Sequence, residues 1–213
     1  MPPIVSIVGK SKSGKTTLIE KLLGELKSRG YKVATIKHTS QKLTFDEPGK
    51  DSWRHIRAGS ETAIISSPDE LVLIKPVTEE PSLEEIAHLA GEGYDLILTE
   101  GFSEGNAPKI EVHRQKAPLA ATRKLFAIVS DEPVKTKTRQ FSPSDIKGLA
   151  DLLERGFITP QRERLSLYVN NTPISLSSFP REIIGNILLA LASSLKGVKE
   201  IKSLEIFLKK KSP

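Results

Sequence analysis

Residues 9–16, GKSKSGKT, restrict the possible folds of this 213-residue chain more than any other segment. They match G-x-x-x-x-G-K-S/T at every required position, between a β-branched run at Pro3–Val8 and apolar residues with helical spacing over Thr16–Arg29. Glycines let the backbone curl so that successive N–H groups converge on phosphate oxygens, and the following helix offers its positive N-terminal end. The segment therefore predicts a phosphate-binding loop between a strand and a helix.

The side chains of this loop have expected roles in nucleotide binding. Lys15 is predicted to reach the β and γ phosphates, and the Thr16 hydroxyl is placed to bind Mg²⁺. The full predicted nucleotide-binding set of the loop is Gly9, Lys10, Ser11, Lys12, Ser13, Gly14, Lys15, Thr16 and Thr17.

An acidic residue at the end of an apolar strand is expected on the metal side of such a loop. Glu100 follows directly after the strand expected over Asp95–Thr99. It is a glutamate where P-loop proteins commonly present an aspartate, so water-mediated contact with Mg²⁺ is as plausible as direct ligation. The alternative is an ordinary solvated strand end.

The identity of the base does not follow from these motifs. The sequence contains no N-K-x-D segment, which is the usual guanine reader of small GTPases. Asp131, just beyond the strand expected over Leu125–Val129, could accept hydrogen bonds from a guanine edge at the carboxyl ends of the strands. A surface turn aspartate before Pro133 is an equally good interpretation.

The remaining pattern predicts an α/β fold with a P-loop NTPase domain over residues 1–164. Gly30 ends the first helix, and Tyr31–Lys37 then gives a strand–helix–strand start, which predicts a mostly parallel sheet flanked by helices. The other expected elements of this domain are paired strands at Thr62–Ser66 and Leu71–Ile74, a capped helix from Ser82 to Ala90, the strand Lys109–His113, and a helix that Ser142 and Pro143 open and that runs to about Arg155.

A domain boundary is expected near Arg164, because the character of the sequence changes there. Residues 165–213 are expected to form a small basic α+β extension. It has seven basic and three acidic residues and so carries most of the net charge of +6 of the whole chain. Its expected elements are strands at Leu165–Val169 and Ile174–Leu176, a helix at Arg181–Leu195 and a last strand at Ile201–Leu208. Because it is too small to be a robust independent domain, we expect it to dock or dimerise.

Composition excludes several classes of function. With no cysteine, disulfides, thiolate catalysis and cysteine-ligated metal centres are ruled out, and a cytoplasmic location fits best. No apolar stretch is long enough to cross a bilayer, so no membrane association is expected. Only Phe207 accompanies the terminal lysines, so nucleic acid ranks last among the candidate partners.

A long polar connection follows the second expected strand and carries the only tryptophan, which marks it as a candidate functional loop. Asp51 and Ser52 begin a helix there. The Asp51 carboxylate could approach the nucleotide as a metal or water partner, or it could cap the helix. His38 and His55 lack the spacing of a metal-binding pair, so no zinc is expected.

Alternation in Pro108–Arg114 places Lys109, Glu111 and His113 on one face of a strand, with apolar residues on the other. The apolar face is expected to be buried, and the other face is charged. A half-exposed edge strand gives the same pattern, so this signal alone is weak.

Several motifs together match the order and spacing of one known family. They are the loop with Lys15-Thr16-Thr17, Ile36-Lys37-His38, the segment Asp46–His55, Ala58-Gly59, Glu100-Gly101-Phe102 and Pro108-Lys109-Ile110-Glu111. Over about residues 4–155 the chain resembles the MobB family, the molybdopterin-guanine dinucleotide biosynthesis adapter proteins. The chain departs from many members at Thr39–Gln41 and at Ser103, where those carry a second histidine and a lysine.

The resemblance implies a GTP-binding protein, usually a homodimer, that acts with the guanylyltransferase joining GMP to molybdopterin. It implies an adapter role with weak GTP hydrolysis at most, and Mg²⁺ flanked by Thr16 and Glu100. The residues that it implies for a cofactor or partner surface are Asp46, Lys50, Asp51, Arg54, Lys109, Glu111 and Arg114.

A P-loop kinase or transferase acting on a small metabolite is the alternative, since the same loop supports phosphoryl transfer when a base and an acceptor pocket are added. The sequence assigns no catalytic residue. Multiple turnovers with a defined acceptor would favour this alternative.

Overall fold

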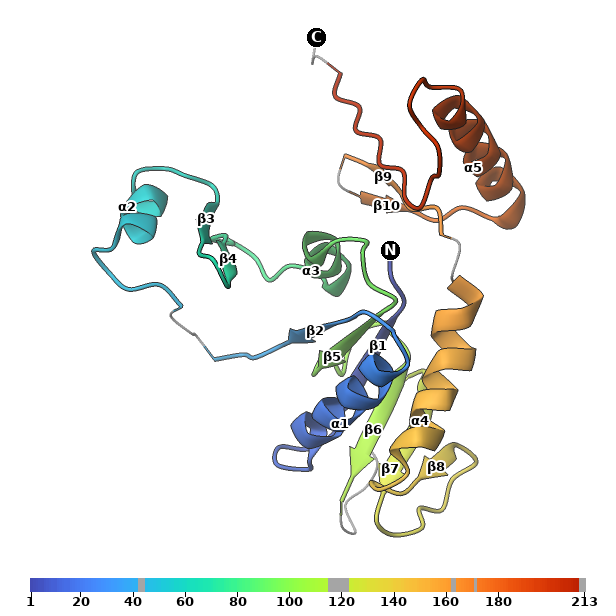
Figure 1. Ribbon diagram of the computed structural model, residues 1–213. Helices are drawn as coiled ribbons and strands as arrows, with labels where there is room; N and C mark the ends of the chain where they lie inside the picture. The colour runs from blue at the N-terminus through green and yellow to red at the C-terminus, as the bar shows by residue number, and fades with distance from the viewer. Residues whose placement is uncertain (42–44, 115–122, 162–163, 171, 211–213) are drawn as a thin grey trace. The chain divides into compact units, whose positions relative to one another are not determined.

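The computed structural model describes residues 1–41, 45–114, 123–161, 164–170 and 172–210. The chain divides into two units, of which the larger comprises Pro2–Arg162 and the smaller Met1 with Glu163–Pro213. Each unit has its own strands and helices (Figure 1). The boundary predicted near Arg164 lies beside this division.

A six-stranded sheet forms the centre of the larger unit. Its strand order is β2-β5-β1-β6-β7-β8, and every neighbouring pair is parallel. The strands are β1 (Ile4–Val8), β2 (Val33–Lys37), β5 (Leu96–Glu100), β6 (Lys109–His113), β7 (Leu125–Ser130) and β8 (Arg139–Phe141). The predicted α/β class with a mostly parallel sheet is confirmed.

Two helices pack apolar side chains against one face of this sheet. On α1 (Lys15–Ser28), the buried side chains of Leu18, Leu22 and Leu26 recur at helical spacing. The helix α4 (Ile146–Leu153) lies beside α1 and buries a second apolar face in the same core (Figure 1). It continues as a π-helical turn at Glu154–Ile158 and a 3₁₀ turn at Thr159–Gln161.

The start of α4 differs from the prediction. Asp145 is the residue that precedes the helix, and its carboxylate accepts a hydrogen bond of 3.0 Å from the Gly148 backbone N–H. The Ser142 hydroxyl lies 2.8 Å from the Ser144 hydroxyl instead. A carboxylate carries more negative charge than a hydroxyl and therefore suits the positive helix end better.

The helix α3 (Leu83–Ala90) begins with the predicted capping box. The Ser82 hydroxyl accepts from the Glu85 backbone N–H, and the Glu85 carboxylate accepts from the Ser82 backbone N–H. The hydrogen bond from the Ser82 backbone N–H, followed by that from the Ser82 hydroxyl, lowers the pKa of Glu85.

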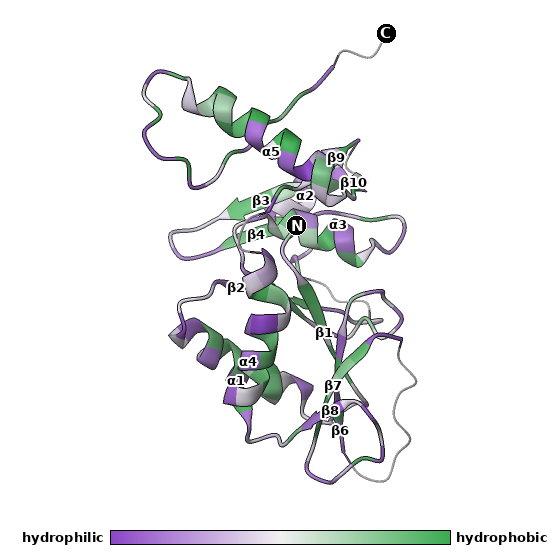
Figure 2. Cartoon of the chain, turned by 90° about the vertical axis from the view of Figure 1, so that its right-hand side faces the viewer, coloured by the Kyte–Doolittle hydropathy of each residue, from purple (hydrophilic) through white to green (hydrophobic). Residues whose placement is uncertain are grey.

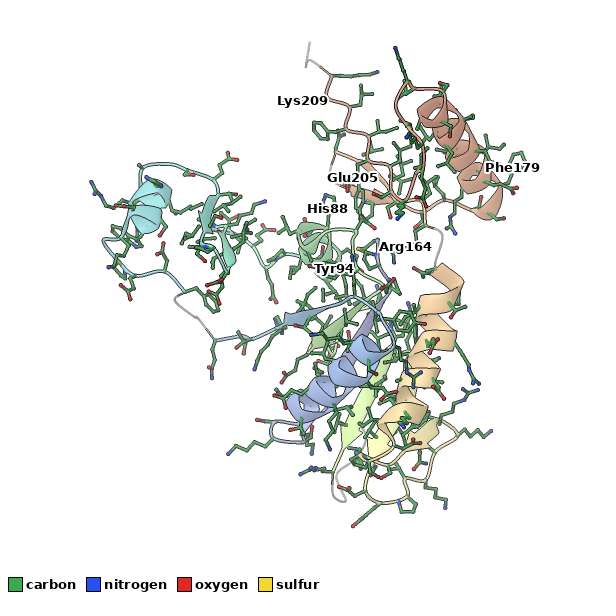
Figure 3. All side chains as sticks on the ribbon, viewed as in Figure 1. His88, Tyr94, Arg164, Phe179, Glu205 and Lys209 are labelled. Atoms are coloured by element: carbon green, nitrogen blue, oxygen red, sulfur yellow. The ribbon has the colours of Figure 1, made fainter. Side chains whose placement is uncertain are left out.

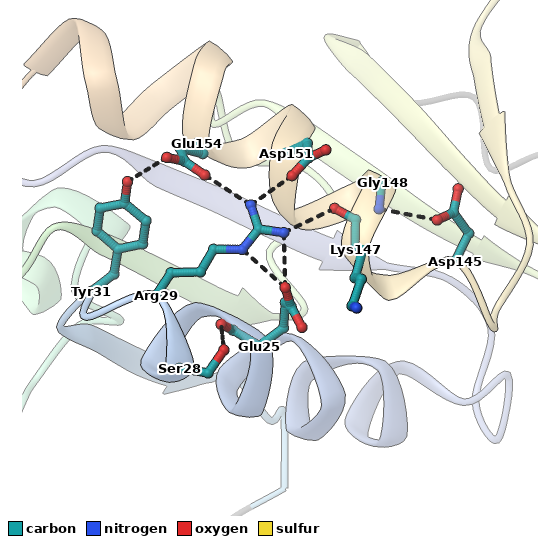
Figure 4. Close-up of polar contacts among 9 residues, drawn as sticks. All are labelled: Glu25, Ser28, Arg29, Tyr31, Asp145, Lys147, Gly148, Asp151 and Glu154. Carbon is teal, nitrogen blue, oxygen red and sulfur yellow. Dashed lines mark hydrogen bonds and ion pairs between the residues drawn. The ribbon is translucent and has the colours of Figure 1, made fainter.

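A guanidinium-centred network joins α1 to α4 (Figure 4). Arg29, at the end of α1, donates to the carboxylates of Glu25 at 2.8 Å, Asp151 at 2.6 Å and Glu154 at 2.8 Å. The Tyr31 hydroxyl donates to the other oxygen of Glu154 at 2.6 Å. The Tyr31 hydrogen bond, followed by that of Arg29, holds the pKa of Glu154 below its usual range, and the carboxylates raise the pKa of Arg29.

We expect Arg29→Ala to lower the free energy of unfolding by about 2 kcal/mol at neutral pH, since several charge-assisted hydrogen bonds are lost. A carboxyl with a lowered folded-state pKa contributes stability above its unfolded pKa and loses it as the pH falls through the folded value. The difference between parent and variant should therefore narrow between about pH 5 and pH 3. Urea unfolding across that range measures it, and a constant difference would contradict the role of the network.

The segment between β2 and α3 contains α2 (Asp51–Arg57) and the strands β3 (Ala63–Ser66) and β4 (Leu71–Ile74). The two strands form the predicted antiparallel hairpin. Apolar side chains on both strands are exposed, among them Ile64 and Leu71.

The smaller unit contains an antiparallel pair, β9 (Leu167–Val169) and β10 (Thr172–Ile174), and the helix α5 (Ser178–Ser193). Hydrophobic residues continue along α5 (Figure 2), and Phe179 stands away from the helix (Figure 3) with 72% of its surface exposed. Among the described residues, no helix is both long and apolar enough to span a bilayer.

The prediction of a strand over Ile201–Leu208 is wrong, because these residues form no strand in the structure. Their alternation of apolar and polar residues suits a strand, but a strand also needs a neighbouring backbone for its hydrogen bonds. The β9–β10 pair has no third member in the described part of the chain.

Candidate nucleotide-binding site

The loop between β1 and α1 approaches the backbone of β6 closely. Gly9 has φ +141°, and a methyl group added there would lie 2.4 Å from the Val112 carbonyl oxygen. Gly14, at the start of α1, has φ +102°. Only glycine adopts these conformations freely, so both glycines of the motif have a geometric cause.

The Lys15 ammonium is held across this loop. Its Nζ donates to the Gly9 carbonyl oxygen at 2.9 Å and to the Lys10 carbonyl oxygen at 2.8 Å. An ammonium carries three hydrogens, so one donor remains for an anion at the loop.

Thr16 and Glu100 lie together, as the sequence predicts for a metal site. The Thr16 hydroxyl is 3.1 and 3.0 Å from the two Glu100 carboxylate oxygens. The parallel register of β1 and β5 pairs Ile7 with Glu100, which brings the end of β5 next to the loop. A hydroxyl and a carboxylate are ligand types that Mg²⁺ accepts beside phosphate oxygens and water.

A cavity of about 350 Å³ opens at this place. Among the described residues that line it, Lys12, Lys15 and Arg114 are cationic, and Glu100 alone carries a carboxylate. The other lining residues are Gly14, Thr16 and Thr17. The excess of positive charge favours a polyanion.

Ser13 gives an independent test of whether the loop fits a phosphate. Its hydroxyl oxygen is buried and has no hydrogen-bond partner in the described part of the chain. Ser13 belongs to the loop, and its hydroxyl oxygen lies 3.0 Å from where a Gly9 side chain would begin. A buried hydroxyl without a partner is costly, so a phosphate oxygen at the loop would satisfy it. The residues present therefore fit a Mg²⁺-bound polyphosphate.

Two of the sequence motifs meet beside Glu100. The His38 backbone N–H donates to the Glu100 carbonyl oxygen at 3.0 Å, and the His38 ring lies 4.8 Å from the Phe102 ring. The His38 side chain also contacts Glu80. A methyl group on Gly101 would lie 3.2 Å from the His38 Cβ atom, a tight contact, and the φ of +106° at this residue also favours glycine.

The alternative of a half-exposed edge strand at Lys109–His113 is wrong. Lys109 and Glu111 are 1% and 3% exposed, because β6 lies between β1 and β7 and is not an edge strand. The Lys109 ammonium donates to the carbonyl oxygens of Gly105, Ala107 and Arg123. Burial, with the nearby Lys124 charge, lowers its pKa. Glu111 lies 3.5 Å from the His113 ring nitrogen.

The other predicted surface residues occupy the segment around α2. The Ser52 hydroxyl donates to the Asp46 carboxylate at 2.9 Å, and Asp51 lies 3.9 Å from Arg54. Lys50 precedes the helix, so the alternative in which Asp51 caps α2 is wrong. Asp46, Lys50, Asp51 and Arg54 do not line the cavity, and their roles stay predictions.

Asp131 directly follows β7 and is exposed. It does not line the cavity, and its contact with a base stays a prediction. Arg114, by contrast, lines the cavity, although the resemblance placed it only on a cofactor or partner surface.

The parallel sheet and the glycine loop after its central strand define a P-loop NTPase-like fold. Comparison of the sequence with family models finds Molybdopterin guanine dinucleotide synthesis protein B over residues 4–131. The chain belongs to this family, MobB, as its motifs predict.

Known relatives agree with this membership. The molybdopterin-guanine dinucleotide biosynthesis adapter protein of Haemophilus influenzae is 35% identical over 156 residues, which are 71% of this chain and 88% of the relative. The Escherichia coli protein of the same description is 34% identical over 164 residues, or 72% and 92% of the two chains.

Solved structures also agree. A crystal structure of molybdopterin-guanine biosynthesis protein B superposes with a TM-score of 0.58 at 34% identity, covering 71% of this chain and 97% of that one. Bacillus subtilis MobB gives a TM-score of 0.58 at 25% identity, covering 73% and 98%. The matched shares leave about a quarter of this chain outside each comparison.

Proposed function

We propose that this protein is a GTP-binding adapter in molybdenum cofactor biosynthesis, where it assists the guanylyltransferase that forms molybdopterin-guanine dinucleotide. The strongest support is the glycine loop of this MobB family member, where the Thr16 hydroxyl lies within hydrogen-bond distance of the Glu100 carboxylate. Relatives that share about a third of their residues with this chain are described as adapter proteins of that pathway.

The cavity supports binding better than rapid catalysis. Its cations suit the phosphates, and Thr16 and Glu100 would hold Mg²⁺, which neutralises phosphate charge when bound. Among the described residues that line the cavity, Glu100 is the only carboxylate, and both its oxygens lie within hydrogen-bond distance of Thr16. These residues therefore offer no separate base to activate water. Weak GTP hydrolysis at most is the expected consequence.

The proposal includes partners. The guanylyltransferase and molybdopterin come from the family role, and a second copy of the chain is the expected homodimer partner. The β3–β4 hairpin supports self-association, because a two-stranded sheet with exposed apolar side chains is marginally stable on its own.

We expect Mg²⁺ to strengthen GTP binding by about tenfold or more, and this gain to vanish in Glu100→Gln and in Thr16→Ala. Removing the carboxylate charge takes away a metal ligand, yet it also removes repulsion from the phosphates, so binding in EDTA should be equal or tighter. Calorimetric titration of GTP with Mg²⁺ and with EDTA measures both effects.

Glu61→Gln is the matched control, since Glu61 is exposed and does not line the cavity. An unchanged magnesium gain in both site variants would refute the metal role. Titrating ATP beside GTP tests the base preference. Multiple turnovers of phosphoryl transfer to a defined acceptor would replace the adapter by the kinase or transferase alternative.

A further inference from the structure

The sheet order places three chemical groups in a row across the loop. β5 and β6 lie on either side of β1, and the glycine loop follows β1. Glu100 ends β5 on one side, Arg114 directly follows β6 on the other, and Asp131 follows β7 one strand further out. All these strands are parallel, so their carboxyl ends lie at the same edge of the sheet.

The Arg114 guanidinium lies against the start of α1. A methyl group added at Gly14 would be 3.4 Å from the Arg114 Nη2 atom, 3.7 Å from Cζ and 3.8 Å from Nε. Three atoms of the planar group at nearly equal distances indicate that it lies broadside to this glycine. A side chain at position 14 would therefore compete with the guanidinium for the same space.

Arg114 also differs from the structural arginine of the core. Arg29 engages three carboxylates, whereas no carboxylate in the described part of the chain forms an ion pair with Arg114. The guanidinium instead borders the cavity with Lys15 and Thr16. A guanidinium presents donors in a fixed fork that matches two oxygens of one phosphate.

We propose that Arg114 binds the phosphates of the nucleotide nearest the nucleoside, at the end of the cavity opposite the metal. This inference rests on the proposed function. The Thr16 hydroxyl and the Glu100 carboxylate would hold Mg²⁺ beside the β and γ phosphates, on the β5 side of the loop. The nucleoside side of the polyphosphate would then lie on the opposite side of the loop, toward β6, where Arg114 borders the cavity. Arg114 would then contact the phosphates of GDP as well as those of GTP. Discrimination between the two nucleotides would depend on the other end of the cavity, at Thr16 and Glu100.

The test compares GTP with GDP, each titrated calorimetrically with Mg²⁺ into the full chain. We expect Arg114→Ala to weaken both nucleotides by the same factor, about 10- to 100-fold. Arg114→Lys should recover only part of the loss, because an ammonium lacks the fork. Arg155→Ala is the matched control, since Arg155 is exposed on the π-helical turn and away from the cavity lining.

Each other outcome overturns the inference in a recognisable way. A loss confined to GTP would place Arg114 at the terminal phosphate, and affinities equal to those of the parent would remove it from the site. If the parent bound neither nucleotide, the proposed function itself would fail. Thermal melting of each variant separates a binding loss from a folding loss, and Arg114→Gln repeats the test with a side chain that keeps hydrogen-bonding capacity.

Discussion

Lys15→Ala lowers the affinity for GTP by about 100-fold or more, the largest binding loss that we expect from any single substitution in this chain. The ammonium is tied to the Gly9 and Lys10 carbonyl oxygens, so it is already oriented where the β and γ phosphates would lie. Alanine removes both the charge and this orientation. Calorimetric titration in the presence of Mg²⁺ measures the loss.

Lys21→Ala is the control for charge alone, because Lys21 is an exposed lysine on the same helix and does not line the cavity. It should bind GTP like the parent, with a shift of a few-fold at most from the change in net charge. Equal affinities of Lys15→Ala and Lys21→Ala for GTP would contradict the nucleotide site, and with it the proposed function.

The loop was predictable because its determinants are local. The required glycines, Lys15 and Thr16 stand within eight residues, and the flanking strand and helix have clear periodicity. Predicting Glu100 needed one further inference, namely that the end of an apolar strand lies at the same edge of a parallel sheet as the loop. The structure places its carboxylate within 3.1 Å of the Thr16 hydroxyl.

The burial of Lys109 and the position of Arg114 required information that the strand pattern does not contain. Both follow from β6 lying beside β1, a pairing between residues about a hundred positions apart. Alternation of charged and apolar residues is the same for an edge strand and for an interior strand whose lysine reaches backbone carbonyls. The loop directly before Lys109 supplies two of those carbonyls, from Gly105 and Ala107.

The strand expected over Ile201–Leu208 failed for a related reason. Side-chain alternation indicates that a segment fits a sheet, but whether a partner strand is available depends on the rest of the fold. The predicted start of α4 differs from the observed one because Ser142 and Asp145 are both residue types that cap helices well. Propensity alone does not distinguish between them.

Gly9→Ala is the substitution with the largest expected effect on the fold around the site. Its φ of +141° is already unfavourable for alanine, and the new methyl group would lie 2.4 Å from the Val112 carbonyl oxygen. That oxygen belongs to the backbone of β6, so relief requires the loop to move away from the strand. We expect a loss of about 3 kcal/mol or more in the free energy of unfolding, together with loss of GTP binding.

Gly59→Ala separates the two causes, because Gly59 also has a positive φ, +109°, but nothing lies within 4 Å of an added methyl group. It should cost only the backbone strain, about 1–2 kcal/mol, and leave GTP binding intact. Urea unfolding and calorimetry of the two variants give the comparison. Equal losses would mean that strain alone acts at Gly9, and that the close approach of β6, which also brings Arg114 to the loop, does not constrain the site.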